Sequence, residues 1–185
     1  MQLHFAESQL TALIMTDALL SSLVCESPAF KGFTICLTDF TGEEGVSSLP
    51  NYSCEGYVEG KLVEHDRILF QPVCVLIKVG STKRYFHGVI TNFAVGGKTA
   101  NHKIKVSFRF SHDVWRLQTV FESWRFEKKS VIDIFLAICK KYNIRDVDAS
   151  HLVKHYPTLA HVVQHQETGF DFLQRLLSEH AIDYY

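Results

Sequence analysis

Apolar and polar residues alternate along the first part of the chain, which is the pattern of half-buried strands. From 103 to 110, apolar residues occupy the even positions and Lys, Ser or Arg the odd positions. Further β-rich runs cover 33–38, 68–79 and 84–93, with turns expected at 41–45 and at Gly96-Gly97. Several strands joined by short turns, without a helix between them, predict an antiparallel barrel or sandwich.

The pattern changes after Trp115 to a helical period. Residues 131, 134, 135 and 138 are apolar and fall on one stripe of a helix. Ser130 and Asp133 have the spacing of a capping box, in which each side chain accepts a hydrogen bond from the other residue's backbone N–H. Asn143 follows where a left-handed residue is needed to end the helix. The sequence therefore predicts a helix between Ser130 and Asn143.

The same signals recur near the end of the printed sequence. A strand is predicted over 159–164. Thr168 is the expected N-cap of a second helix, and Asp171, three residues later, is expected to complete a second capping box. The apolar stripe of this helix consists of Phe170, Leu173, Leu176 and Leu177. The whole pattern predicts a mixed, β-rich α+β fold: an antiparallel β-barrel over 1–115, followed by a small α+β unit with two capped helices over 116–185.

Composition narrows the class of protein. Of the 185 residues 46% are hydrophobic, which suffices for a substantial core. The net charge is −1, so the composition does not indicate a nucleic-acid-binding protein. The apolar run 10–24 is too short and too polar to span a bilayer, and it lacks the basic start of a signal peptide. The five cysteines have no regular spacing, so free thiols and a reducing cytoplasm are expected.

Ten histidines suggest a metal-dependent enzyme as one alternative, centred on 151–165. His151 and His155 have the spacing of zinc ligands on a helix, but the β-pattern that follows argues against one continuous helix. His161 and His165 on a strand would lie about 13 Å apart, which is too far for one ion. The sequence also contains no local signature of a catalytic nucleophile or a phosphate loop. We therefore expect no catalytic, cofactor-binding or metal-binding residues.

Three ordered segments carry a family resemblance. The first consists of Arg84, Tyr85, Phe86, His87 and Gly88. The second consists of Trp115, Arg125, Phe126 and Asp133. The third consists of Gln164, Glu167, Asp171, Phe172, Arg175 and Leu176. In this order and spacing they resemble the VgrG family of type VI secretion spike proteins, well over 80–185 and loosely over 1–79.

The resemblance implies a structural role without catalysis or a cofactor. VgrG proteins are similar to the hub of contractile phage baseplates, and they form a homotrimer whose barrels sit on the hexameric tube protein Hcp. A tip protein or effector attaches beyond a needle, and the second barrel and the needle are not in this sequence. The chain is therefore expected to be the N-terminal part of such a component, either as a fragment of a longer protein or as a truncated or split gene product, and the α+β unit is expected to be incomplete.

The resemblance also implies a location. The chain is expected to assemble in the bacterial cytoplasm and then to be exported by the type VI machine, without a signal peptide, membrane insertion or nucleic-acid binding. A phage or prophage tail baseplate hub is the main alternative. Residues 7–24 suit either a helix, by their composition, or a pair of strands, by analogy with the family.

Individual residues receive expected structural roles. Arg125 is expected to anchor a junction between the barrel and the α+β unit. Glu167 and Arg175 are expected to form ion pairs between elements, and Asp171 to cap the second helix. Arg175 also lies four residues after Asp171, so these two are expected to pair for about 0.3 kcal/mol.

The sequence departs from the family pattern at two places around the second helix. The family's Glu-Ser-Asp is Glu167-Thr168-Gly169 here, so one acidic residue is missing. The usual glycine after the helix is Ala181, and a left-handed alanine there would cost on the order of 1 kcal/mol.

Overall fold

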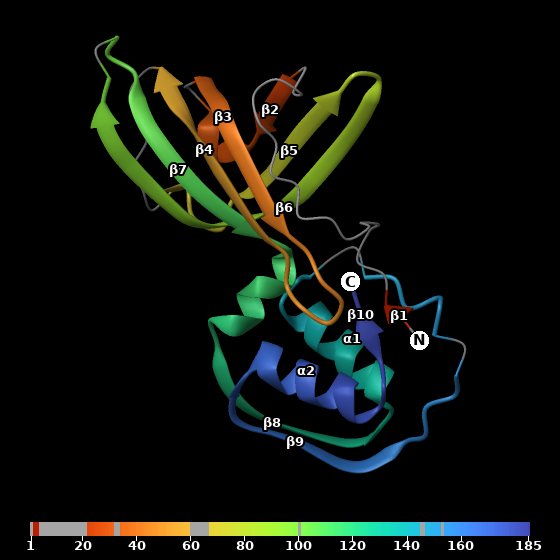
Figure 1. Ribbon diagram of the computed structural model, residues 1–185. Coiled ribbons are helices and arrows are strands. Elements are labelled where there is room, and N and C mark those ends of the chain that lie inside the picture. The colour runs from red at the N-terminus through yellow and green to blue at the C-terminus, as the bar shows by residue number, and fades with distance from the viewer. Residues whose placement is uncertain are drawn as a thin grey trace. The chain divides into compact units, whose positions relative to one another are not determined.

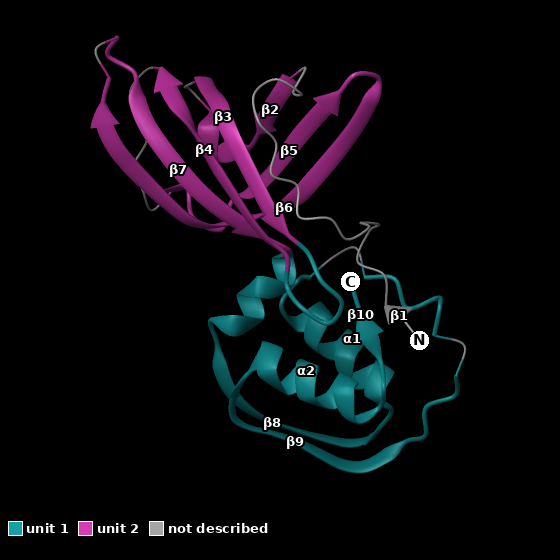
Figure 2. Ribbon diagram, viewed as in Figure 1, with its two compact units in different colours: residues 1–10, 44–49, 113–185 teal, residues 11–43, 50–112 magenta. Residues whose placement is uncertain are grey.

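The chain divides into two compact units. A computed structural model of the protein describes residues 2–3, 22–31, 34–59, 67–99, 101–144, 147–152 and 154–185. Unit 1 contains residues 1–10, 44–49 and 113–185, and unit 2 contains residues 11–43 and 50–112 (Figure 2). The sequence predicts two consecutive regions that meet near residue 115, whereas unit 1 also takes in the short segment 44–49 from within the barrel sequence.

Unit 2 is a nearly closed, six-stranded antiparallel barrel (Figure 1), so the predicted barrel is confirmed. The strands are β2 (Ser22–Glu26), β3 (Thr34–Glu43), β4 (Asn51–Glu59), β5 (Pro72–Val79), β6 (Thr82–Lys98) and β7 (Ile104–Ser111). Their order is β2-β5-β6-β7-β4-β3, and every neighbouring pair is antiparallel. A short 3-10 helix, η1 (Pro28–Phe30), follows β2.

The barrel interior is aromatic. Alternate residues of β4, β5 and β7 are buried, as expected for strands with one face toward a core. The rings that pack together there are those of Phe30, Phe40, Tyr52, Phe86, Phe93, Phe108 and Phe110. Phe40 and Phe86 are the closest of these pairs, with ring centroids 4.7 Å apart. The burial of these large rings, together with aliphatic side chains such as Val75 and Ile90, stabilises this unit.

Three predicted strand boundaries in the barrel are wrong. β3 continues to Glu43, so the turn expected at 41–45 starts later. Of the apolar run 68–79, only Pro72–Val79 is a strand; Ile68 is fully buried but lies in a turn that includes Phe70 at φ 60°. Gly96-Gly97 is part of β6, where the register to β7 shifts between Val95 and Lys98. A bulge accommodates the glycines without ending the strand.

Unit 1 combines two helices with short strands. The elements are η3 (Asp113–Gln118), β8 (Phe121–Lys129), α1 (Val131–Lys141), β9 (Leu159–Thr168), α2 (Gly169–Glu179) and β10 (Asp183–Tyr184), with β1 (Gln2–Leu3) from the start of the chain. β8 and β9 form an antiparallel ribbon, and β10 pairs in parallel with β1. Both predicted helical stripes are buried in one core, where Phe126 of β8 stacks on Phe172 of α2 at 5.9 Å.

Both helices end in the same way. The N–H of Ile144 donates to the carbonyl of Cys139, and the N–H of Ile182 donates to that of Leu177. This is the Schellman arrangement, which requires a left-handed residue after the helix. Asn143 has φ 54°, so the left-handed position predicted there is confirmed, and Ala181 has φ 53°, so the alanine that replaces the family's glycine is left-handed as well.

The segment 44–49 completes unit 1. Ser47 donates from its backbone N–H to the carbonyl of Tyr184, at 2.7 Å, and from its hydroxyl to the carboxylate of Asp183, at 2.9 Å. Gln174 of α2 donates to the carbonyl of Ser47, and Leu49 packs against the core. These partners are more than 100 residues away in the sequence, and sequence patterns did not indicate the contact.

Several sequence expectations concern residues that the structure does not describe. Of the segment 7–24, only Ser22, Leu23 and Val24 are described, in β2, so the choice between helix and strands lies outside the described residues.

All five cysteines are described and are free thiols. Among the described residues, no helix is long and apolar enough to cross a membrane.

Candidate functional site

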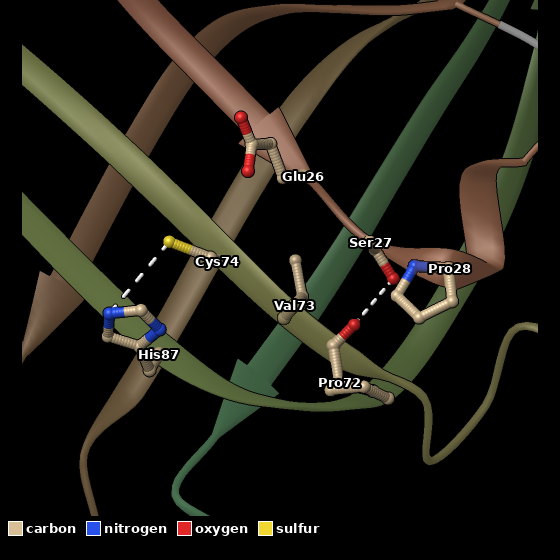
Figure 3. Close-up of a pocket in the computed structure, with 7 residues that line it drawn as sticks. All are labelled: Glu26, Ser27, Pro28, Pro72, Val73, Cys74 and His87. Atoms are coloured by element: carbon tan, nitrogen blue, oxygen red, sulfur yellow. Dashed lines mark hydrogen bonds between the residues drawn. The ribbon is translucent and has the colours of Figure 1, made fainter.

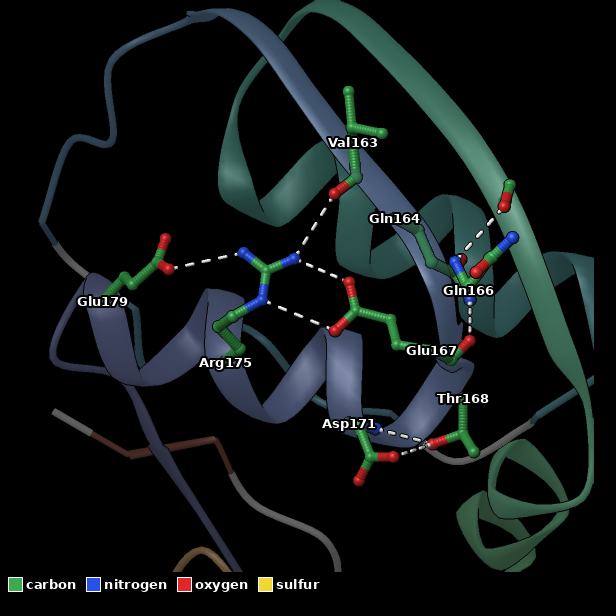
Figure 4. A network of polar contacts seen from close by, with 9 residues as sticks. Val163, Gln164, Gln166, Glu167, Thr168, Asp171, Arg175 and Glu179 are labelled. Atoms are coloured by element: carbon green, nitrogen blue, oxygen red, sulfur yellow. Dashed lines mark hydrogen bonds and ion pairs between the residues drawn. The ribbon is translucent and has the colours of Figure 1, made fainter.

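Arg175 joins β9 to α2 (Figure 4). Its guanidinium lies 2.7 Å from the carboxylate of Glu167, 3.3 Å from that of Glu179, and donates to the carbonyl of Val163. The predicted ion pair between Glu167 and Arg175 is therefore confirmed. The predicted pair with Asp171 is wrong: among the described ion pairs, Arg175 is joined to Glu167 and Glu179. The Asp171 carboxylate instead accepts a hydrogen bond at the helix cap.

The Arg175 contact is partly exposed to solvent. Both oxygens of the Glu167 carboxylate accept from the guanidinium, at 2.7 and 3.5 Å. This hydrogen bonding raises the pKa of Arg175 above its usual value. The guanidinium also lies 5.4 Å from the ring centre of Phe172. A two-point pair at such exposure contributes about 0.5–1 kcal/mol. The hydrogen bonds of Arg175 therefore link α2 to β9.

Gln164 is a buried polar residue at a β-bulge. Its side chain is 2% exposed and donates to the carbonyl of Glu167 at 3.0 Å. Gln166 adopts φ 48°, and its N–H donates to the hydroxyl of Ser123, where the register between β8 and β9 shifts. The amide thus satisfies a carbonyl that the bulge removes from the regular ladder. Figure 4 shows this amide beside the Glu167–Arg175 pair.

The helix caps are built from adjacent polar side chains. Ser130 and Asp133 form the predicted capping box, with backbone-to-side-chain distances of 3.2 and 3.0 Å. At α2, the hydroxyl of Thr168 accepts from the N–H of Asp171 at 3.0 Å and donates to its carboxylate at 2.7 Å. Thr168 is therefore the cap, and Asp171 holds its side chain in position; among the described hydrogen bonds the Thr168 N–H does not donate to Asp171, so the predicted second capping box is only half formed.

The remaining motif residues of unit 1 divide into core and surface. Phe126, Phe172 and Leu176 are buried in the core. Trp115 is half-buried in η3. Arg125 lies on the exposed side of β8, 2.8 Å from Glu127 and 3.5 Å from the imidazole of His161. Both partners belong to unit 1, so a junction role for Arg125 stays a prediction.

The motif on β6 alternates across the barrel wall. Phe86 is buried inside, and the guanidinium of Arg84 lies 4.6 Å from the centre of its ring. Tyr85 and His87 are exposed on the outside, with their rings nearly parallel and 6.2 Å apart. The core therefore explains the inward half of the motif, whereas the outward half faces solvent among the described residues.

Two glycines are required by close approach between strands. A Cβ at Gly88 would overlap the backbone carbonyl of Ser111 on β7. A Cβ at Gly56 would overlap the carbonyl of Cys36 on β3, next to a bulge. Sequence reasoning includes Gly88 only as a motif residue, because a contact with a strand more than 20 residues away leaves no local signal.

A shallow pocket lies on the outside of the barrel (Figure 3). It is lined by Glu26, Ser27, Pro28, Pro72, Val73, Cys74 and His87. The sulfur of Cys74 lies 3.9 Å from Nε2 of His87, and the hydroxyl of Ser27 donates to the carbonyl of Pro72 at 2.5 Å. Burial, and secondarily the Glu26 carboxylate, raise the pKa of the Cys74 thiol. The thiol is therefore protonated at neutral pH, which does not suit a catalytic nucleophile.

The histidines from 151 to 165 lie outside any helix. His151 lies 3.9 Å from Asp148, and His161 and His165 are exposed on β9. Across the part of the chain that the structure describes, no group of three or more His, Cys, Asp or Glu side chains is arranged to hold a metal ion.

Sequence comparison assigns the chain to a family. The profile of the family described as phage tail baseplate hub (GPD) matches residues 43–185. This is more than half of the chain and includes all three motif segments. The chain belongs to the phage tail baseplate hub family.

Curated relatives of this hub chain are type VI secretion spike proteins of Pseudomonas aeruginosa. VgrG1c is 24% identical over 148 residues, which cover 78% of this chain and 20% of the relative. VgrG1a is 23% identical over 180 residues, which cover 96% of this chain and 26% of the relative. The predicted resemblance to VgrG proteins is confirmed. The chain spans about a fifth to a quarter of the length of these relatives.

Solved structures share the hub fold. An E. coli protein, c3393, aligns with a TM-score of 0.69 at 19% identity and covers 84% of this chain and 43% of its own. It is described as a component of the type VI secretion system with structural similarity to the T4 bacteriophage tail proteins gp27 and gp5. The 43 kDa tail protein of prophage MuSo2 from Shewanella oneidensis aligns with a TM-score of 0.56 at 14% identity, covering 85% of this chain and 48% of its own.

The motif residues thus form two groups within the hub chain. The structure brings the third segment together on β9 and α2, around Gln164, Glu167 and Arg175. It places the first segment, residues 84–88, on β6 of unit 2. Most motif side chains pack, cap helices or form ion pairs, which is the character of a scaffold.

Proposed function

We propose that the chain is the N-terminal hub portion of a VgrG-type spike, which docks on the hexameric tube protein Hcp of a type VI secretion system. The observation that carries this proposal is the match to the baseplate hub family over 43–185, together with the barrel of unit 2. The similarity to VgrG1a over 96% of the chain supports the spike in particular.

The chemistry of the motif residues supports a structural role without catalysis. Glu167 and Arg175 neutralise each other, and Asp133 and Asp171 are occupied at helix caps. The close Cys–His pair formed by Cys74 and His87 has a thiol whose pKa is raised. A reactive thiolate would need the opposite shift.

The partners follow from the same proposal. The hub acts as a homotrimer, because three chains that each carry a pair of barrels, as the family resemblance implies, can match the sixfold symmetry of a tube. A tip protein or effector is a further partner of the complete spike. The component assembles in the bacterial cytoplasm and leaves the cell with the type VI machine.

A phage or prophage tail baseplate hub is the second candidate. The description of the matched family favours it directly, since that family is named for phage tails. The two candidates share the fold and differ in the particle that the hub completes.

Deletion of the gene in the native host tests the proposal. We expect the tube protein to disappear from the culture supernatant while it remains in the cells, and the intact gene to restore export. A copy with an early stop codon is the matched control. Unchanged export together with loss of infective particles would favour the phage candidate, and no change in either would contradict a hub function.

A further inference from the structure

Three side chains with metal-binding chemistry occupy one row across neighbouring strands of the barrel. In the register of the sheet, Glu26 of β2 lies opposite Cys74 of β5, and Cys74 lies opposite His87 of β6. Residues directly opposite each other in a sheet point to the same face. Figure 3 shows the three side chains on the outer face, at the edge of the shallow pocket.

Two of the three side chains are already close to the spacing of a shared ion. The sulfur of Cys74 and Nε2 of His87 are 3.9 Å apart. A tetrahedral zinc ion with Zn–S of about 2.3 Å and Zn–N of about 2.0 Å would separate these atoms by about 3.6 Å. Small rotations of two side chains remove that difference.

The third residue of the row, Glu26, lies on the strand next to Cys74. Glu26 is exposed, and it acts electrostatically on the thiol of Cys74 across the strand pair. Opposite Cβ atoms in an antiparallel pair are about 5 Å apart, so the carboxylate of a glutamate can reach an ion held by its neighbour. Among the described residues no group of three metal ligands is preformed, so a site here needs the Glu26 carboxylate to move toward the ion.

We propose that Glu26, Cys74 and His87 form a binding site for a divalent cation of the zinc class on the outer face of the barrel. Water fills the fourth position, because the pocket is open on that side. The thiol releases its proton when the ion binds, so affinity increases with pH. β2 lies at one edge of the six-stranded sheet, and the ion links it to both β5 and β6.

Cobalt titration of the full chain tests the site, because Co²⁺ replaces Zn²⁺ and a thiolate ligand gives a near-ultraviolet charge-transfer band. We expect one Co²⁺ to bind with this band and to be displaced by Zn²⁺. Cys74→Ser removes the band, and His87→Gln and Glu26→Gln each weaken binding by about tenfold or more. Zn²⁺ also raises the melting temperature of the wild type and leaves that of C74S unchanged.

Cys36→Ser is the matched control, because Cys36 is an exposed thiol on β3 outside this row. Its band and affinity are expected to equal those of the wild type. The proposal is overturned if Co²⁺ gives no thiolate band at millimolar concentration, if C74S retains the band, or if C36S loses it. Far-ultraviolet circular dichroism of each variant shows that lost binding is not lost folding.

Discussion

The two units obtain their structure from different ranges of the sequence. In unit 1, Ser130 with Asp133 and Thr168 with Asp171 start the helices through contacts three residues apart. In unit 2, each strand is completed by a partner strand, and the aromatic rings of the interior come from four of the six strands and from η1. Local chemistry therefore determines where the helices begin, whereas long-range pairing determines where the strands end.

The comparison can be measured because the protein carries a built-in reporter. Both tryptophans, Trp115 and Trp124, lie in unit 1. Tryptophan fluorescence therefore follows the unfolding of unit 1, whereas hydrogen exchange of the β6 and β7 amides follows unit 2. Changes that affect one unit can be separated from changes that affect both.

The largest effect is expected in the barrel, at Gly88. Gly88→Ala places a Cβ against the backbone carbonyl of Ser111, which cannot move without shifting β7. We expect a loss of about 2–3 kcal/mol in the stability of unit 2. Gly97→Ala, on the same strand with open space around it, is expected to change stability by less than about 0.5 kcal/mol. Hydrogen exchange of β6 measures both, and equal effects would contradict the strand-approach argument.

The next effect is expected at the bulge of unit 1. Gln164→Leu keeps an apolar side chain of similar size but removes the donor to the carbonyl of Glu167, which is then left without that bond in a partly buried position. The expected loss is about 2 kcal/mol in urea unfolding followed by tryptophan fluorescence. Gln118→Leu, an exposed residue of η3, is the control. A Gln164 variant as stable as this control would show that the amide only fills space.

A smaller effect is expected at the cap of α1. Ser130→Ala removes both hydrogen bonds of the Ser130 hydroxyl, and we expect the free energy of unfolding to fall by about 1 kcal/mol. Ser178→Ala, on the exposed face of α2, is the control and is expected to leave the stability unchanged.

The same cap predicts a pH dependence. Hydrogen bonds from the Ser130 hydroxyl and N–H lower the pKa of Asp133. A lowered folded-state pKa stabilises the fold above the unfolded pKa, and this contribution is lost as pH falls through the folded pKa. The difference between the wild type and S130A should therefore be larger at about pH 7 than at about pH 2.5. A difference independent of pH would show that the stability comes from the bond between the hydroxyl and the N–H of Asp133, and not from the bond between the hydroxyl and the Asp133 carboxylate.

The smallest effect should be a gain. Ala181 sits at φ 53° after α2, and Ala181→Gly relieves this conformation. We expect a gain of about 0.5–1 kcal/mol, reduced by the greater freedom of glycine in the unfolded chain. Ala137→Gly within α1 should lose about 1 kcal/mol instead. The opposite signs of two Ala→Gly changes, read by thermal unfolding, separate backbone strain from helix propensity.

Sequence reasoning identified the features that depend on near neighbours. The stripe from Val131 to Ile138, the Ser130 cap and the left-handed Asn143 are all visible within a few residues. The extension of β6 through Gly96-Gly97 and the docking of Ser47 beside β10 depend on distant partners, so no local pattern indicates them. The row of Glu26, Cys74 and His87 was missed for the same reason, since only the sheet register brings the three together.

The central claim is that this chain is a structural part of a contractile particle. The most direct measurement is to isolate such particles from the native host and to locate the chain in them by electron microscopy with a tag at its N-terminus. The account predicts the tag at one end of the tube, in a threefold assembly that contacts the tube protein. Particles that assemble and contain the tube protein without this chain would contradict it.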